Sequence, residues 1–288
     1  MNNYNIAKLN ININGINNEY FNYRLREYST LNTNSTEFCD ILINHQDGCD
    51  DIPIPDGKIV ANVNQRYWME LDNGGFAAVD NITGIDQNLK LIVADNSWSN
   101  IYTKLCDAKL LGLEEDFRTY IMIGEIFKFA ILKHNGIVIH SSAVNCDGNG
   151  ILFSAPSGTG KSTHAGLWKK YYPDKTTILN DDTPVVRFID DIPYVFGTPW
   201  SGKTEINCNQ SAPLKAIVFL EQSKINSIHK IESKEAVWRL LNETRQPALK
   251  EMMNLTLDML EKILKKVPTY FFSCDISPEA VEMAKSVL

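Results

Sequence analysis

The stretch ILFSAPSGTGKSTHAGLW, residues 151–168, decides the fold. An apolar run typical of a strand leads into a glycine-rich turn, after which Lys161 and Ser162 open a segment of helical character. Residues 155–162 match the phosphate-binding pattern G-x-x-x-x-G-K-[ST] except at its first position, which is Ala155. Main-chain N–H groups in such a turn can surround an anion, so the stretch predicts a phosphate-binding loop between a strand and a helix.

A loop of this kind predicts that the protein binds ATP together with Mg²⁺. Lys161 would bridge the β- and γ-phosphates of ATP, and Ser162 would ligate Mg²⁺. Ala155 requires that the first loop residue avoid a conformation open only to glycine. An unliganded strand-to-helix turn is the structural alternative. The predicted nucleotide-binding residues are Ser157, Gly158, Thr159, Gly160, Lys161, Ser162 and Thr163.

A pair of aspartates follows the next apolar run. ILNDDTPVV, residues 178–186, places Asp181 and Asp182 about twenty residues after Lys161. In phosphoryl transfer one carboxylate typically supports Mg²⁺ and another accepts the proton of the substrate hydroxyl. Adjacent residues at the end of an extended strand point in opposite directions, so the two cannot act in the same way. A solvated turn is the alternative, because Asp-Asp before Thr-Pro is good turn material.

Two further features allow two interpretations each. GTPWSGKTE, residues 197–205, is either a second loop that contacts an anion through Lys203 or a turn with a packed tryptophan. His164, on the helix after the loop, is interpreted mainly as a packing or surface residue, with nucleotide contact as the alternative.

Composition excludes several classes of protein. The chain has 288 residues, 44% of them hydrophobic and 22% charged, as expected for one or two globular domains. A net charge of −7 gives no support to nucleic-acid binding. No basic, apolar leader and no apolar run long enough for a bilayer is present. Six scattered cysteines without a CxxC pair favour a cytoplasmic protein with reduced thiols and no zinc site.

The order of the expected elements divides the chain into three parts. Residues 1–112 predict a β-rich region, an antiparallel and partly open sheet, with strands at 6–13, 40–44, 68–71, 76–79 and 89–94. Residues 113–135 predict one helix that bridges the two halves, acidic at its start and closed by Asn135 or Gly136. In residues 136–288 strands alternate with helices, which predicts an α/β catalytic domain. Its expected strands are 137–144, 151–155, 176–179, 184–189, 193–197, 214–221 and 269–275, and its expected helices are 161–171, 233–243, 248–266 and 277–288.

Three motifs in order resemble those of a known family. GIVIHSSAV with His140, the loop from Ala155 to Ser162, and LNDDTPVV with Asp181 and Asp182 are similar to the HPr kinase/phosphorylase family and its looser relatives, over roughly residues 134–220. The resemblance implies a mixed-sheet P-loop kinase core of the phosphoenolpyruvate carboxykinase-like type. It also implies that Asp182 is the base that deprotonates an acceptor serine, and that His140 lies close to the phosphates.

The chain departs from that family at one metal-binding position. The family's glutamate in an EIRG-type segment is missing, FGTPWSGKTEIN (residues 196–207) stands in its place, and Glu205 is the candidate replacement. This looks like a divergent branch, some of whose members occur with peptide-modifying systems. The candidate metal ligands are therefore Ser162, Asp181 and Glu205, and the candidate catalytic residues are Asp182, Lys161, His140 and Asp181.

The resulting hypothesis is a kinase that uses ATP and Mg²⁺ to phosphorylate a serine-type hydroxyl of a peptide, a protein or a small molecule. A nucleotide-binding or hydrolysing accessory module of a biosynthetic or peptide-modification complex is the main alternative. A hydrolysing switch or motor and a carboxykinase acting on a small acid are further ones. Neither a nucleic acid nor a membrane is an expected partner, and a homo-oligomer is compatible with the sequence.

Overall fold

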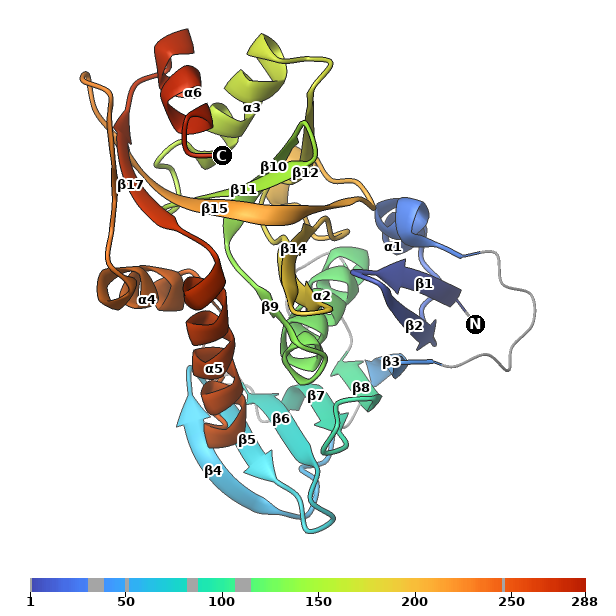
Figure 1. Ribbon diagram of the computed structural model, residues 1–288. Coiled ribbons are helices and arrows are strands. Elements are labelled where there is room, and N and C mark those ends of the chain that lie inside the picture. Colours follow the sequence, from blue (N-terminus) through green and yellow to red (C-terminus); the bar gives the residue numbers. More distant parts are fainter. Residues whose placement is uncertain (1, 31–38, 50–51, 82–87, 107–114, 245–246) are drawn as a thin grey trace. The chain divides into compact units, whose positions relative to one another are not determined.

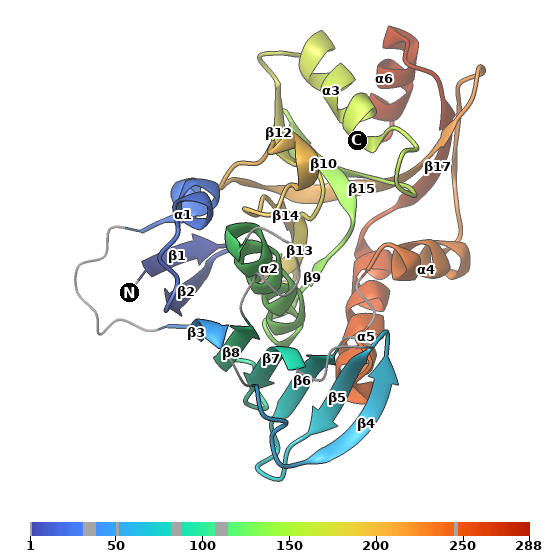
Figure 2. The same ribbon diagram turned by 180° about the vertical axis from the view of Figure 1, so that it is seen from behind.

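The computed structural model describes residues 2–30, 39–49, 52–81, 88–106, 115–244 and 247–288. The chain folds into two compact units. The first comprises Met1–Lys133 with Pro247–Met253, and the second comprises His134–Gln246 with Asn254–Leu288. Figures 1 and 2 show the elements of each unit from opposite sides.

The first unit is built on a mixed sheet. Its strand order is β1-β2-β3-β8-β7-β6-β5-β4, in which β2, β3 and β8 pair in parallel and the remaining neighbours are antiparallel. The prediction of a purely antiparallel sheet is therefore wrong, because parallel pairing joins segments distant in the sequence. The strands are β1 (Asn2–Ile6), β2 (Leu9–Asn14), β3 (Ile41–Cys49), β4 (Lys58–Val63), β5 (Arg66–Glu70), β6 (Phe76–Asn81), β7 (Asn88–Ala94) and β8 (Asn100–Cys106).

One expected strand of this unit is a hairpin instead. Residues 6–13 were expected to run straight, but Ala7 and Lys8 have φ values of 52° and 61° and turn the chain back between β1 and β2. Two positive φ values are the geometry of a tight hairpin turn, which is usually signalled by Asn-Gly or Asp-Gly. Neither residue belongs to those types, so the turn gives no signal in the sequence.

Two short helical elements and one long helix belong to the first unit within the described ranges. They are α1 (Glu19–Leu25), η1 (Arg26–Tyr28) and α2 (Glu115–Lys133). The predicted long helix is thus confirmed as α2, and its expected first residues, 113 and 114, lie outside the described residues. Asn135 has φ 57°, the left-handed conformation expected of a residue that ends a helix. Phe129 of α2 packs edge-on against Trp68 of β5, with ring centroids 5.3 Å apart.

An ion network ties α2 to the sheet of this unit. Glu125 of α2 forms ion pairs with Arg66 of β5 and with Lys90 of β7, the second at 2.7 Å, and Asp80 of β6 joins both cations. Burial opposes ionisation of Glu125, but the positive charges of Lys90 and Arg66 outweigh it and hold its pKa well below the usual range. Glu125 is therefore ionised in the folded unit at neutral pH.

We expect Glu125→Gln to destabilise the first unit by about 3 kcal/mol at pH 7, because it leaves two buried cations short of a partner. The pKa of Glu125 is lower in the folded than in the unfolded chain, where it is about 4.3. The stabilisation is hence complete above that value and is lost as the pH falls through the folded value. Urea unfolding at pH 7 and pH 3 checks this; a difference between variant and wild type that fails to shrink at pH 3 contradicts it.

The second unit contains a sheet of nine strands within the described ranges. Its main path is β12-β10-β11-β15-β14-β13-β9, and β17 pairs with β15 and with β16. The strands β11, β15 and β17 are mutually parallel, as βαβ crossovers require, and the other pairings are antiparallel. The strands are β9 (Gly136–Val138), β10 (Ser141–Cys146), β11 (Asn149–Ser154), β12 (Thr176–Asn180), β13 (Val185–Ile189), β14 (Ile192–Phe196), β15 (Ser211–Gln222), β16 (Ser227–Lys230) and β17 (Thr269–Cys274).

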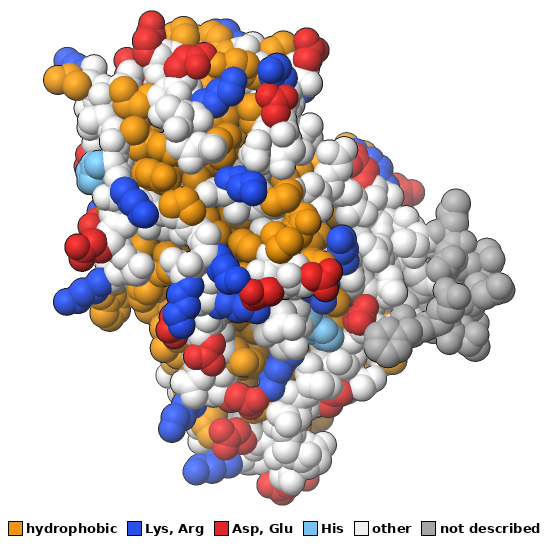
Figure 3. Space-filling model, viewed as in Figure 1, with side chains coloured by type: hydrophobic (Ala, Val, Ile, Leu, Met, Phe, Trp, Pro, Cys, Tyr) orange, Lys and Arg blue, Asp and Glu red, His pale blue; other side chains and the backbone are white. Residues whose placement is uncertain are grey.

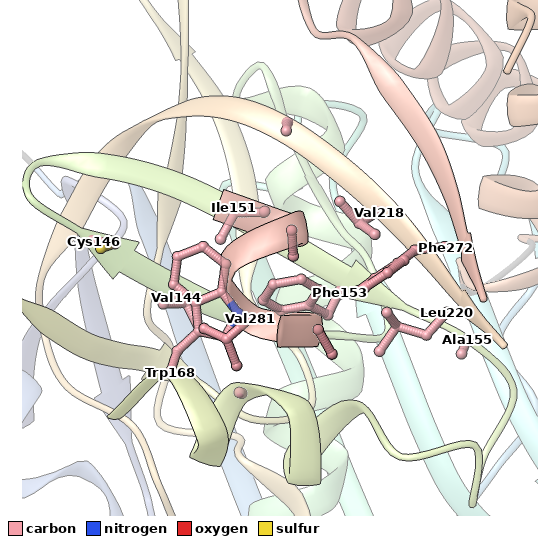
Figure 4. Packing of buried hydrophobic residues seen from close by; sticks show 14 residues of the cluster. Val144, Cys146, Ile151, Phe153, Ala155, Trp168, Val218, Leu220, Phe272 and Val281 are labelled. Carbon is pink, nitrogen blue, oxygen red and sulfur yellow. The ribbon is translucent and has the colours of Figure 1, made fainter. Parts of the chain in front are cut away.

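Two helices cover one face of this sheet. Figures 1 and 2 both place α3 and α6 together on the side of β10, β11, β15 and β17. The buried cluster in Figure 4 joins them, with Phe153 of β11, Trp168 of α3 and Val281 of α6 all at most 1% exposed. The helices are α3 (Lys161–Tyr171), α4 (Ser233–Asn242), α5 (Lys250–Lys266) and α6 (Pro278–Lys285), together with the short η3 (Gly202–Thr204).

The fold is mixed α/β, with a mixed sheet in each unit. Expected helix 161–171 is confirmed at both ends, and Ser277 caps α6 by accepting the N–H of Ala280. The expected strand 137–144 is instead broken into β9 and β10 at Ile139 and His140. At this break the N–H of Ile139 bonds Pro184 and the N–H of His140 bonds Glu243, which separates His140 from both ladders.

Candidate nucleotide-binding and phosphoryl-transfer site

The glycine-rich loop lies between the buried strand β11 and the helix α3. Gly158 and Gly160 have φ values of 82° and 109°, a region that favours glycine, and a Cβ at either position would meet no atom closer than 3.9 Å. Conformation rather than space therefore requires glycine at both positions. Ala155 is not among the residues of positive φ, as its replacement of the motif's first glycine requires.

The start of α3 is open to an anion. Gly160 is the N-cap and makes no side-chain capping bond, so the first N–H groups of the helix have no acceptor within it. Ser157, Gly158, Ser162 and Thr163 are exposed, and Thr159 and Gly160 are half-buried. The helix dipole adds positive potential at this end. The loop thus presents an accessible, positively polarised end of a helix.

Lys161 is buried, unlike its neighbours Gly160 and Ser162. It is 7% exposed, and its Nζ donates to the carbonyl oxygens of Ala155 at 2.6 Å and of Pro156 at 3.5 Å. Burial lowers the pKa of Lys161, against the opposing charges of Glu243, Asp182 and Asp181. The ammonium group is therefore folded back on its own loop and lies in the field of three carboxylates.

The paired aspartates have different surroundings. Asp181 is 6% exposed; its Oδ1 accepts a 2.5 Å bond from the hydroxyl of Ser142, and its buried Oδ2 has no hydrogen-bond partner in the described part of the chain. Asp182 is half-exposed and its Oδ1 lies 3.6 Å from Nε2 of His140. The buried Asp181 suits a fixed ligand position, whereas Asp182 faces solvent and a titratable ring.

Asn180 holds this turn in place, a role that the sequence analysis missed. Its Oδ1 accepts the N–H groups of Asp182 at 2.8 Å and of Thr183 at 2.7 Å. Its Nδ2 donates to the carbonyl oxygens of Thr198 and Trp200, at 2.8 and 3.1 Å. The sequence signal was an asparagine directly before the turn, since its side chain commonly bonds the backbone two residues on.

Glu243 is the second residue that the sequence analysis missed. Its Oε2 lies 2.8 Å from Nδ1 of His140, and its carbonyl oxygen accepts the N–H of the same histidine. Because a carboxylate only accepts, Nδ1 of His140 donates, and a neutral ring then presents Nε2 to Asp182 as an acceptor. Glu243 follows α4 and is 103 residues from His140, so no local pattern connects the two.

We expect Glu243→Gln to lower the rate of phosphoryl transfer by about tenfold, the size of effect typical when the partner that orients a functional histidine is lost. ATP affinity should stay unchanged, because Glu243 makes none of the loop's hydrogen bonds. Initial rates and equilibrium binding measured on the same preparations test this. Glu235→Gln, at the exposed start of the same helix, is the matched control. A full rate in Glu243→Gln would remove His140 and Glu243 from the machinery.

The segment GTPWSGKTE approaches Asp182. A Cβ on Gly202, whose φ is 61°, would lie 3.1 Å from Cβ and Cγ of Asp182. Asp181 donates its N–H to the carbonyl oxygen of Ile206, next to Glu205. Lys203 and Glu205 are exposed, so their contact with an anion or a metal stays a prediction. Within the described ranges, no group of three or more His, Cys, Asp or Glu side chains is arranged to hold a metal ion by itself.

The charged side chains, the cysteines and the hydrophobicity of the helices describe the rest of the molecule. On the face drawn in Figure 3, acidic and basic side chains are interspersed. All six cysteines are free thiols. None of the helices in the described part of the chain has the length and hydrophobicity needed to cross a membrane.

Comparison with known proteins gives one family match. A family model described as "SynChlorMet cassette protein ScmC" matches residues 114–288, well over half of the chain. The chain belongs to the ScmC family. The ScmC region contains the loop, both aspartates, His140 and Glu243, and it spans the whole second unit.

Curated proteins and solved structures were also compared with this ScmC-family chain. No curated protein matches it. Among solved structures, the HPr(Ser) kinase/phosphatase from Coxiella burnetii is similar at 8% identity with a TM-score of 0.31, over 52% of this chain and 92% of that one. A similarity at this identity and TM-score shows neither the function of this chain nor the roles of its residues.

Proposed function

We propose that the second unit is an ATP- and Mg²⁺-dependent kinase that transfers the γ-phosphoryl group to a serine-type hydroxyl of a peptide, a protein or a small molecule. Its core would be a P-loop fold of the phosphoenolpyruvate carboxykinase-like type. The observation that carries the proposal is the position of Lys161. The lysine at the start of the helix after the glycine-rich loop lies in the electrostatic field of Glu243, Asp182 and Asp181. His140 lies beside two of these carboxylates, and phosphoryl transfer requires groups of these kinds.

The loop supplies the phosphate-binding half of the site. The unpaired N–H groups at the start of α3 would bind the β-phosphate, and Lys161 would exchange the carbonyl of Ala155 for phosphate oxygens. Burial now disfavours the ammonium form of Lys161, and an anion beside it would offset that cost. Binding energy is thereby directed at the position where charge develops in the transition state.

The residues present fit a magnesium ion held jointly with phosphate oxygens. The buried Oδ2 of Asp181 lacks a partner among the described residues, and Mg²⁺ is usually bound by one or two carboxylates together with phosphates. Asp181 and the hydroxyl of Ser162 would hold the ion, and Glu205 remains a further candidate ligand. When bound, Mg²⁺ neutralises charge on the β- and γ-oxygens.

The remaining residues would handle the acceptor's proton. Asp182 is half-exposed, as a group must be to meet an incoming hydroxyl, and would accept its proton. Nε2 of His140, an acceptor while Glu243 holds the Nδ1–H, would accept a hydrogen bond from Asp182 once Asp182 has taken the proton of the hydroxyl. Asn180 holds the backbone of the turn, so that the two aspartates keep separate roles.

Labelled ATP tests the proposal. The full chain is incubated with γ-labelled ATP, Mg²⁺ and candidate acceptors that carry serine hydroxyls, including the products of neighbouring genes, and both labelled acceptor and free phosphate are measured. Label on an acceptor, lost on chelation of Mg²⁺, is the expected result. Release of phosphate alone would instead favour the hydrolysing accessory module, and binding without either product would contradict a kinase.

A further inference from the structure

A cavity of about 340 Å³ adjoins the glycine-rich loop, and nothing in the proposed chemistry uses it. Its volume lies at the lower end of the range typical of small-molecule sites. Thr159, Gly160 and Thr163 belong both to the loop or helix start and to the cavity wall. Whatever enters the cavity therefore lies directly beside the position predicted for the phosphates.

The cavity also lies at the carboxyl ends of parallel strands. Leu220 and Gln222 lie at the end of β15, Ser223 follows it, and Cys274 is the last residue of β17. Both strands are parallel to β11, from which the loop departs. In open α/β sheets ligands bind in the crevice outside these strand ends. Gln222 also donates to the carbonyl oxygen of Thr159 at 3.2 Å, which fixes the loop against this wall.

The chemistry of the wall favours a neutral ligand. Among the described residues that line the cavity there is no lysine or arginine, and Asp275 is the only one with an acidic side chain. Hydrogen bonds from Ser277 and Asn226 hold the pKa of Asp275 below its usual range, and burial raises that of the Cys274 thiol to about 11. A phosphate would be repelled by the carboxylate of Asp275, whereas hydroxyl groups could donate to it. Within the described part of the chain, Asn226 and Ser277 donate their hydrogen bonds to Oδ1 of Asp275, which leaves Oδ2 for such a donor.

His164 adds a donor to this wall. Nε2 of His164 accepts the indole N–H of Trp168 at 3.2 Å, and an indole only donates, so the proton of the neutral ring is on Nδ1. Burial lowers the pKa of His164 to about 4, which keeps the ring neutral near pH 7. Its buried Nδ1 has no hydrogen-bond partner within the part of the chain described. A buried N–H without a partner is costly, and a bound acceptor would relieve that cost.

Apolar side chains also line the cavity. Among them, Ile276 is 72% exposed. Leu167, one turn after Thr163 on α3, is half-buried. A flat aromatic ring lying between such groups would remove their apolar surface from water.

We propose that this cavity binds the base and ribose of the nucleotide. The phosphates would then lie at the start of α3, and the nucleoside would lie along the first two turns of the same helix. The proposal rests on the proposed function of the loop. It adds that the protein recognises the nucleoside as well as the phosphates, and so prefers ATP to an inorganic polyphosphate. The ribose hydroxyls would point toward Asp275, and the base would lie between Leu167 and Ile276.

Calorimetric titration of the full chain with Mg-ATP and with Mg-tripolyphosphate tests this. Wild type should bind ATP at least about tenfold more tightly, a difference of about 1.4 kcal/mol. Leu167→Trp, which fills the cavity, should abolish that difference and leave tripolyphosphate binding unchanged. Lys170→Trp, which places the same side chain on the exposed face of α3, should behave as wild type. Ile276→Ser changes an exposed side chain and should weaken the binding of ATP several-fold. It is the second test variant if Leu167→Trp does not fold.

The outcomes separate the two proposals. If wild type binds tripolyphosphate and ATP equally, or if both Leu167→Trp and Ile276→Ser keep the full preference for ATP, the nucleoside does not lie in this cavity, although the loop still binds phosphates. If wild type binds neither ligand, the phosphate function of the loop fails and the cavity proposal falls with it.

Discussion

Lys161→Ala is expected to lower phosphoryl transfer by about 10³-fold, at the upper end of what loss of one charge-stabilising donor costs. Lys161 lies at the start of α3, and under the proposed function the γ-phosphoryl group would be transferred beside it. The variant should still fold, because burial disfavours the charged form of Lys161 and alanine carries no charge at this position. Initial rates with γ-labelled ATP, together with the thermal unfolding temperature, measure both effects.

The control for this variant comes from the same helix. Lys170 lies on the exposed part of α3, so Lys170→Ala removes a like charge without touching the loop. It should leave both rate and stability close to those of wild type. A Lys161→Ala protein that is folded and fully active would show that the loop is not the catalytic cradle.

Asp182→Asn is expected to lose transfer by about 10²- to 10⁴-fold and to keep its affinity for ATP. The amide preserves the size of the side chain and its approach to Gly202, but it cannot accept the proton of a hydroxyl. Affinity should be kept because Asp182 makes no hydrogen bond to the loop. Single-turnover rates at saturating ATP, compared with equilibrium binding, separate the two quantities.

Asp190→Asn is the matched control for Asp182→Asn. Asp190 lies on the exposed turn between β13 and β14 with φ 48°, a conformation that asparagine tolerates well, so this change should have no effect. Turnover retained in Asp182→Asn would assign the base to Asp181 or to another group. Loss of ATP binding in the same variant would mean that Asp182 holds the nucleotide rather than the acceptor.

The sequence could predict the features of the site that are local. Two glycines of positive φ, a lysine at the start of α3 and an aspartate pair at the end of β12 each follow from a few adjacent residues. Ala155 was correctly expected to avoid the glycine-only region. Patterns of this kind are readable because turn and helix-start chemistry is set within one or two turns of chain.

What could not be predicted depends on contacts between distant segments. Glu243 reaches His140 from beyond α4, and Asn180 connects its own turn to Thr198 and Trp200. The parallel pairing of β2, β3 and β8 in the first unit has the same cause, and the Ala7–Lys8 turn lacks the residues that mark such hairpins. Tertiary structure decides these features, and a single sequence does not reveal them.

The most direct measurement is a crystal structure of the chain with Mg²⁺ and a non-hydrolysable ATP analogue. The account predicts the β-phosphate on the N–H groups of residues 158–162, Nζ of Lys161 moved from the carbonyl of Ala155 to phosphate oxygens, and Asp181 on the metal side. A nucleotide bound elsewhere, or a loop that stays closed around Lys161 with no anion in it, would contradict the account.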